Sequence, residues 1–311
     1  SEEGVEIEEA YFTTTALPAG LRIKGGKFKS DFGRHNNSHH HAWNFADAPL
    51  VYEAFLGSHG INEKGAQLQW VAPIDTYLMV GLEVLQGENE QMFGNGEIQH
   101  DINETTTDDV AEAANAPSLT VAYAKTSFDI GNTSLLAGVS YAKGDSRIDH
   151  LDDGENPHAF YGESTLYGAD LTFKHYYSSY RSLSWENELI YRDMDGIQYS
   201  GVTSGSADMN KKQAGYYTQL IYAHNQNWRT GLRYDDIYKN NVNGNEINAG
   251  DRYSVMAEYN PSEFSRIRLQ YNVNKALFEH DDATDSYIQK DLKSVIVQFN
   301  YAIGAHGAHA F

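Results

Sequence analysis

The chain has 311 residues and a formal net charge of −20, with 43 acidic side chains against 23 basic ones. This balance argues against nucleic-acid binding, which needs a basic surface, and the absence of cysteine excludes disulfide frameworks and thiolate metal sites. No run of 18 apolar residues occurs, so no transmembrane helix is predicted, although the 22 tyrosines and four tryptophans are residues favoured at membrane interfaces.

Apolar and polar residues alternate with a period of two along much of the chain, which predicts β-strands rather than helices. In the clearest stretch, near 266–274, Ile267 and Leu269 face one way while Arg268 faces the other. The alternating stretches lie, in chain order, near 5–15, 20–29, 64–72, 76–86, 117–127, 135–141, 167–174, 185–192, 213–224, 228–235, 255–259, 266–274 and 293–301. The sequence therefore predicts about thirteen strands.

The connections between these stretches alternate in length. Short turns are expected near 17–20, 72–75, 130–132, 177–180, 225–227 and 260–263, and long polar stretches near 30–63, 87–116, 144–163, 193–212, 238–250 and 276–290. Short periplasmic turns and long extracellular loops are typical of outer-membrane barrels. We therefore predict an all-β, transmembrane, antiparallel up-and-down β-barrel, a single domain over residues 1–311, integral to the bacterial outer membrane. The alternative is a soluble β-sandwich or solenoid, but a sandwich has a polar outward face.

The last strand and the end of the chain also favour an outer-membrane barrel. Val295, Val297, Phe299 and Tyr301 fall on one face of the strand, and Phe311 is a terminal aromatic residue. Thirteen is an odd number, whereas bacterial single-chain barrels have even strand counts. Either strands that precede Ser1 are missing or one strand has been miscounted, and we favour the first explanation.

Several stretches resemble a family of proteobacterial outer-membrane proteins described as zinc-regulated and, loosely, as TonB-dependent-receptor-like. They are Gly4–Thr14, Leu17–Lys27, His41–Phe45, Leu85–Glu90, Ser262–Tyr271 and Ile303–Phe311. The family is similar to the phosphate-selective porins, which form sixteen-stranded barrels. The resemblance implies about three further N-terminal strands, which would make sixteen. It does not imply an energised receptor, because that would need a plug domain and about 22 strands.

Four histidines in the first long loop form the most pointed candidate site. They are His35, His39, His40 and His41, with Asp31 or Asp47 as further oxygen ligands. Imidazole nitrogens suit zinc, copper or nickel, so this loop is a tentative metal site. The alternatives are a solvated loop, or one folded into the barrel as a constriction. The tail residues His306 and His309 extend the histidine pattern to the opposite mouth.

Charged residues on the polar faces of the strands are predicted to line the lumen, because an arginine or lysine facing lipid at mid-depth costs about 2–4 kcal/mol. They are Arg22, Lys24, Asp170, Lys174, Glu186, Glu188, Arg192, Arg229, Arg233, Glu258, Arg266 and Arg268. Rings of such charges set ion preference. Because both signs are present, pairing across the lumen would leave a weakly selective channel or a closed one.

We therefore predict a porin-like channel for passive diffusion of ions or small solutes, with a link to zinc or another divalent metal. The alternative is a structural barrel with a closed lumen, serving as a sheath, adhesin or assembly partner. No catalytic constellation stands out, so we predict no enzyme. No cofactor is required, and zinc is the candidate if one binds. The expected partners are outer-membrane lipid, lipopolysaccharide and small solutes, but not nucleic acid, and a homotrimer remains open.

Overall fold

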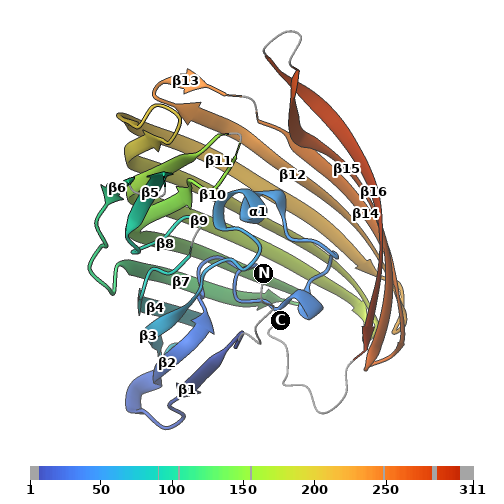
Figure 1. Cartoon of the computed structure of the whole chain (residues 1–311). Coiled ribbons are helices and arrows are strands. Elements are labelled where there is room, and N and C mark those ends of the chain that lie inside the picture. The colour runs from blue at the N-terminus through green and yellow to red at the C-terminus, as the bar shows by residue number, and fades with distance from the viewer. Residues whose placement is uncertain are drawn as a thin grey trace.

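The computed structural model describes residues 7–89, 91–103, 106–154, 156–247, 249–281 and 286–301. Phe311, His306 and His309 lie outside the described residues, so the expectations for the tail stay predictions. Figure 1 shows one large sheet that curves around a concave interior. Its strands follow one another in chain order, each antiparallel to the next: β1 (Ala10–Thr13), β2 (Leu21–Lys29), β3 (Asn62–Val71), β4 (Tyr77–Leu85), β7 (Leu119–Ile130), β8 (Thr133–His150), β9 (His158–Ser178), β10 (Arg181–Ser200), β11 (Gly205–Ala223), β12 (Trp228–Val242), β14 (Asp251–Ser262), β15 (Ser265–Asp281) and β16 (Ser286–Tyr301).

This path through the described residues contains thirteen strands, and each corresponds to one of the thirteen predicted stretches. The prediction of an all-β, antiparallel up-and-down sheet is thus confirmed. The two-residue β13 (Asn245–Glu246) pairs with β12, and β1 and β16 lie at the two edges of the sheet. Over the same residues, the structure contains no helix of the length and apolar character needed to cross a bilayer.

The two faces of the sheet differ in chemistry, because successive residues of a strand point in opposite directions. On β10, Glu186 and Glu188 are buried on the inner face, where they accept hydrogen bonds from Asn44 and Tyr52, whereas Trp185 and Leu189 are exposed on the opposite, outer face. On β15, Leu269 is exposed in the same way, and its neighbour Arg268 is fully buried. A sheet of this kind presents hydrocarbon-compatible side chains outward and polar groups inward.

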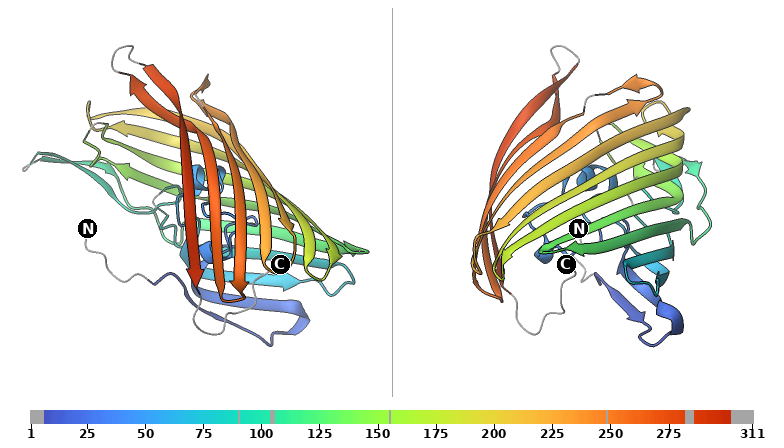
Figure 2. Two further views of the ribbon diagram at one scale, coloured as in Figure 1. Left: turned by 90° about the vertical axis from the view of Figure 1, so that its right-hand side faces the viewer. Right: turned by 180° about the vertical axis from the view of Figure 1, so that it is seen from behind.

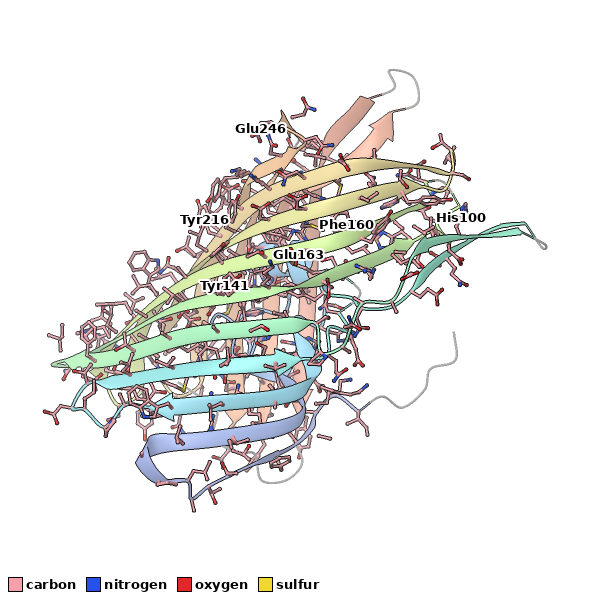
Figure 3. All side chains as sticks on the ribbon, turned by 90° about the vertical axis from the view of Figure 1, so that its left-hand side faces the viewer. His100, Tyr141, Phe160, Glu163, Tyr216 and Glu246 are labelled. Atoms are coloured by element: carbon pink, nitrogen blue, oxygen red, sulfur yellow. The ribbon has the colours of Figure 1, made fainter. Side chains whose placement is uncertain are left out.

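Two rows of aromatic side chains border the apolar outer face. In one row, the ring of Tyr167 lies 5.4 Å from that of Tyr141 and 6.1 Å from that of Tyr191. Tyr141 and Tyr216 project from this face in Figure 3. Nearer the short turns, Trp228 contacts Tyr259 at 4.8 Å. Along β9, the ten residue steps from Tyr167 to Tyr177 correspond to a height of about 25 Å at a typical barrel tilt, the height of the apolar band of an outer-membrane barrel.

Several strands continue well beyond this band, which corrects the prediction of long loops near 144–163 and 193–212. β8 to β11 have 18, 21, 20 and 19 residues, and the connections between them shrink to 151–157, 179–180 and 201–204. Beyond the band no lipid faces these strands, so every second residue no longer has to be apolar, and the alternation that marks a strand in the sequence disappears. The ladder of backbone hydrogen bonds continues without it, with β9 and β10 paired from Ser178 and Arg181 to His158 and Ser200.

Two connecting segments fold back onto the sheet. Residues 30–61, called here the inward segment, lie against the concave inner face and include a 3-10 helix at His40–Ala42 and α1 (Leu50–Leu56). Figure 2 shows α1 within the curve of the sheet from two further directions. The hairpin of β5 (Ile98–Asn103) and β6 (Thr106–Ala111) instead covers the outer ends of β9 and β10, where Ile98 and Ala111 pack with Ala159 and Tyr199.

Candidate functional site

The inner face of the sheet and the inward segment together form the candidate site. The segment leaves β2 at Ser30 and meets the wall over most of its length. One part of the contact is apolar: Val51, Phe55 and Leu56 of α1 are buried in one cluster with Leu166 and Ile190 of the wall. The other part is polar and involves the charged side chains that the strands carry inward.

Asp47 is the centre of the polar contact. Its carboxylate lies 2.6 Å from Nη2 of Arg233 on β12 and 3.4 Å from Nη1 of Arg252 on β14. It also accepts hydrogen bonds from Gln270 at 2.7 Å and Asn272 at 2.8 Å, both on β15. Burial alone would raise the pKa of the Asp47 carboxyl, but the two guanidinium groups outweigh it and hold that pKa below its ordinary value. Three neighbouring strands therefore converge on one carboxylate of the inward segment.

Glu188 on β10 forms a second anchor, near the start of the segment. Its carboxylate accepts hydrogen bonds from the hydroxyl groups of Tyr52 at 2.6 Å and Tyr217 at 3.1 Å. It also accepts the backbone N–H groups of Arg34 at 3.1 Å and His35 at 3.3 Å. A carboxylate in the wall thus fixes the backbone of an irregular segment that has few partners of its own.

Arginines on β15 hold the middle of the segment through its carbonyl groups. Arg268 donates to the carbonyl oxygen of Trp43 at 2.7 Å, and Arg266 to that of His41 at 2.5 Å. Arg268 also pairs with Glu258 at 2.6 Å, and Arg229 lies 3.9 Å from the same carboxylate. On the opposite side, Asn44 donates to Glu186 at 3.2 Å. Much of the wall charge near the segment is therefore engaged in holding it.

The remaining predicted lumen charges lie apart from these anchors. Arg22 donates to Gln69, and the ammonium group of Lys24 lies over the rings of Tyr11 and Phe28. Arg192 is buried, donates to the carbonyl oxygen of Phe55 and stacks on its ring, 4.6 Å from the centroid. Asp170 lies beside Glu188 across the strand pair, and Lys174 lies 5.1 Å from the Tyr176 ring.

The four predicted metal-binding histidines do not converge on one point. His35 is enclosed by the rings of Trp43 at 4.5 Å and Tyr52 at 4.9 Å. His39 instead lies 3.4 Å from Glu8 and 2.9 Å from Glu9, with the ring of His41 stacked 5.4 Å away. His40 contacts the ring of Trp43 at 4.3 Å. In the part of the chain that the structure describes, no three His, Asp or Glu side chains form a group that would hold a metal ion.

Some residues of the site are not among the predicted ones. Arg252 could have been predicted from the same period of two, because Arg252, Ser254 and Glu258 share one face of β14. It lies just before the alternating stretch predicted at 255–259. Tyr52 has no such signal, because it belongs to a short helix whose partner Glu188 lies 136 residues away. The sequence suggests Asp47 only as a metal ligand, whereas its contacts are with two arginines and two side-chain amides.

Comparisons with known proteins agree with this fold. No family model matches the chain, so the resemblance to the zinc-regulated family stays a prediction. The chain is 45% identical over 318 residues to an uncharacterised protein of Aquifex aeolicus, covering all of this chain and 64% of that protein's length. Among solved structures, the sheet is similar to outer-membrane expressed OmpT of Vibrio cholerae, with a TM-score of 0.50, 11% identity and coverage of 93% of this chain and 78% of that one. In-vitro folded OmpT gives a TM-score of 0.52 at 10% identity, over 91% and 76% of the two chains.

The fold, the apolar outer band and its two aromatic borders define an outer-membrane β-barrel protein, integral to the bacterial outer membrane. The comparison with OmpT corrects one expectation, that the chain is not an enzyme. That exclusion rested on the lack of a recognisable catalytic pattern in the sequence. It does not hold for a chain that shares the fold of OmpT, because one fold carries unrelated activities and a catalytic set drawn from distant strands leaves no local motif.

Proposed function

We propose that the protein is a channel of the porin type, through which ions or small polar solutes diffuse past the inward segment. The observation that carries the proposal is the charged character of the interior, where Arg34, Asp47 and Arg266 keep 25%, 16% and 15% of their side-chain surface exposed and each forms an ion pair with a buried charge of the wall. Buried ion pairs contribute little to stability compared with apolar residues of the same size. A barrel that served only as a scaffold would gain by replacing them, so their presence supports a polar path.

The inward segment would set the width and the ion preference of this path. Guanidinium groups from β12, β14 and β15 meet its middle, and carboxylates from β10 meet its start. Because both signs of charge take part, the expected channel is narrow and weakly selective. An acidic chain as a whole would favour cations at the outer mouth.

A barrel with a closed lumen is the second candidate, and one observation favours it. α1 does not merely touch the wall, since its apolar side chains are buried together with residues of β9, β10 and β12. Such packing would hold the segment in place even without its ionic anchors. The protein would then be a sheath, an adhesin or an assembly partner.

Single-channel conductance in planar bilayers separates the two functions. The intact protein is compared with Asp47→Asn, which removes the centre of the polar contact, and with Glu53→Gln, which removes a half-exposed partner of Arg252. A channel is expected to conduct in all three forms, with a larger or noisier current for Asp47→Asn. A silent intact protein would contradict the proposal. A current that then appeared in Asp47→Asn alone would identify the segment as a plug.

A link to zinc or another divalent metal is a finer proposal. It is supported by His39, whose ring nitrogens face two carboxylates, and by the neighbouring ring of His41. Calorimetric titration of the intact barrel with zinc is compared with a His39/His40/His41→Ala variant. Weaker binding by the variant is expected, and equal affinity would remove these histidines from the proposal.

A further inference from the structure

A second pair of histidines faces each other across the hairpin that joins β8 to β9. His150 ends β8 and His158 begins β9, and the two residues are cross-strand partners. Nδ1 of His150 lies 3.4 Å from Nε2 of His158. The ring centroids are 5.1 Å apart and the ring planes are inclined by 80°. Phe160, labelled in Figure 3, marks this end of β9.

A contact with a backbone carbonyl fixes the tautomer of the neutral His158 ring. Nδ1 of His158 lies 2.7 Å from the carbonyl oxygen of Asn156, and only an N–H group can satisfy a carbonyl at this distance. In the neutral ring the proton is therefore on Nδ1, and Nε2 carries the lone pair. Nε2 is the nitrogen of His158 that faces His150, so its lone pair is available on the side of the partner ring. A histidine whose second nitrogen donates to a backbone carbonyl has the arrangement commonly found in metal ligands.

The distance between the facing nitrogens suits two ligands of one ion. Zinc–imidazole bonds are about 2.0–2.1 Å long, so two nitrogens of a tetrahedral site lie about 3.3 Å apart. A direct N–H···N bond at 3.4 Å would be long, because such bonds are usually shorter than about 3.2 Å. The rings therefore have the separation of a ligand pair rather than that of a good hydrogen bond.

We propose that His150 and His158 form a binding site for a divalent transition-metal ion that accepts imidazole ligands, such as zinc, nickel or copper. Among the described residues no third His, Asp or Glu completes a group with this pair, so water fills the remaining positions. Both side chains are partly exposed, which leaves room for that water. Asp149 and Asp152 beside the pair raise the local concentration of cations without acting as ligands.

This site is distinct from the histidines of the inward segment and does not depend on whether the barrel conducts. It lies in a hairpin near the outer ends of the strands, whereas His39 lies beside residues that precede β1. A metal ion bound there would link β8 and β9 at their outer ends. The plain alternative is a pair of rings that stabilise the hairpin by contact alone.

The test is metal binding by the intact protein in detergent micelles, with zinc, nickel and copper added as simple salts. His150→Gln and His158→Gln are compared with His175→Gln, which changes a histidine on the same strand that bonds Thr133 at 2.8 Å instead of another imidazole. A His39/His40/His41→Ala variant distinguishes the two histidine groups. We expect either single variant at 150 or 158 to lose one binding site or to bind more than about tenfold more weakly, a loss found even for groups that only orient a ligand. The His175→Gln and triple variants are expected to keep this site.

Bound copper gives a second measurement, a spectrum that would show no imidazole coupling if the two histidines only stabilised the hairpin. The electron paramagnetic resonance spectrum of bound copper should show coupling to two imidazole nitrogens in the intact protein and to fewer in each single variant. The far-ultraviolet circular dichroism of every variant is measured alongside, and His158→Asn replaces any variant whose β signal is lost. Unchanged stoichiometry and affinity in folded His150→Gln and His158→Gln would overturn the proposal, as would a copper spectrum without imidazole coupling.

Discussion

Gly33 shows how strongly a single position is constrained where the inward segment turns under the wall. Its φ angle is +61°, a conformation in which side chains other than hydrogen are strained. A Cβ atom at this position would overlap the carboxylate of Glu188. The N–H group of Gly33 donates to the Ser140 hydroxyl at 2.9 Å, and its carbonyl accepts from Lys125 at 2.7 Å. Glycine therefore permits both the turn and the close approach of the backbone to the wall.

Gly33→Ala is expected to destabilise the protein beyond the cost of its backbone conformation alone. Gly131→Ala is the matched control, because Gly131 has a φ of +62° but no atom within 4 Å of the new Cβ. Both variants incur the left-handed cost of about 1–2 kcal/mol. Gly33→Ala should lose about 1–3 kcal/mol more, the usual cost of overpacking. Urea unfolding monitored by gel mobility measures the difference, and equal losses would show that the contact with Glu188 relaxes freely.

A substitution at Leu269 tests which face of the strands meets the lipid. It is exposed on the outer face in the middle of the first half of β15, whereas Ser265 on the same face lies at the short turn. Leu269→Arg should cost about 2–4 kcal/mol and Ser265→Arg about 0–1 kcal/mol, because arginine is tolerated near the interface. Equilibrium folding into lipid vesicles measures both variants. Similar costs at the two positions would contradict the position assigned to the apolar band.

At the scale of elements, the inward segment is held by contacts that join distant parts of the chain. Asp47 and Arg233 are 186 residues apart, and Glu188 reaches residues 34 and 35 from more than 150 residues away. Arg233 and Arg252 are nearly fully buried, and their charges depend on Asp47 and Asp235 for compensation. The segment is therefore secured most firmly at its polar centre.

Asp47→Asn should loosen the whole segment by about 3–5 kcal/mol, because it leaves two buried guanidinium groups short of one carboxylate. Glu53→Gln is the control, since Glu53 is more than a third exposed and its pair with Arg252 should contribute less than about 1 kcal/mol. Hydrogen exchange of the α1 amides, residues 50–56, reports the opening of the segment. Unchanged protection in Asp47→Asn would mean that the apolar contacts of α1 hold the segment unaided.

The same carboxylate predicts how the segment responds to acid. The pKa of Asp47 in place is lowered from 3.8, with Arg233 and Arg252 outweighing the effect of burial. A lowered pKa contributes stability that is present above the ordinary value and is lost as the pH falls through the lowered value. The contribution of Asp47 to α1 protection should therefore be constant from pH 7 to about 4 and decline only below it. The difference between intact protein and Asp47→Asn, followed over this range, isolates the contribution.

At the scale of the whole molecule, the strands could be predicted from the sequence and the interior arrangement could not. Every second residue of a membrane-spanning strand must be apolar because it faces lipid. Ile267 and Leu269 therefore indicate a strand even when its neighbours are unknown. The position of Asp47 obeys no such local rule, because its partners come from three strands and its own backbone is irregular. The histidine pair at 150 and 158 was likewise hidden, since two predicted loop residues become neighbours only when the strands continue above the membrane.

The great length of β8 to β11 determines how far the wall of the sheet rises above the aromatic border. His158 lies nine residues beyond Tyr167, which at the usual rise and tilt is roughly 20 Å above the aromatic border. This part of the wall therefore stands well above the level of the lipid headgroups, as a curved screen of paired strands on one side of the sheet. Under the proposed channel function, a solute would meet this screen before it reached the level of the membrane, so the outer halves of β8 to β11 would be the first part of the protein to select it.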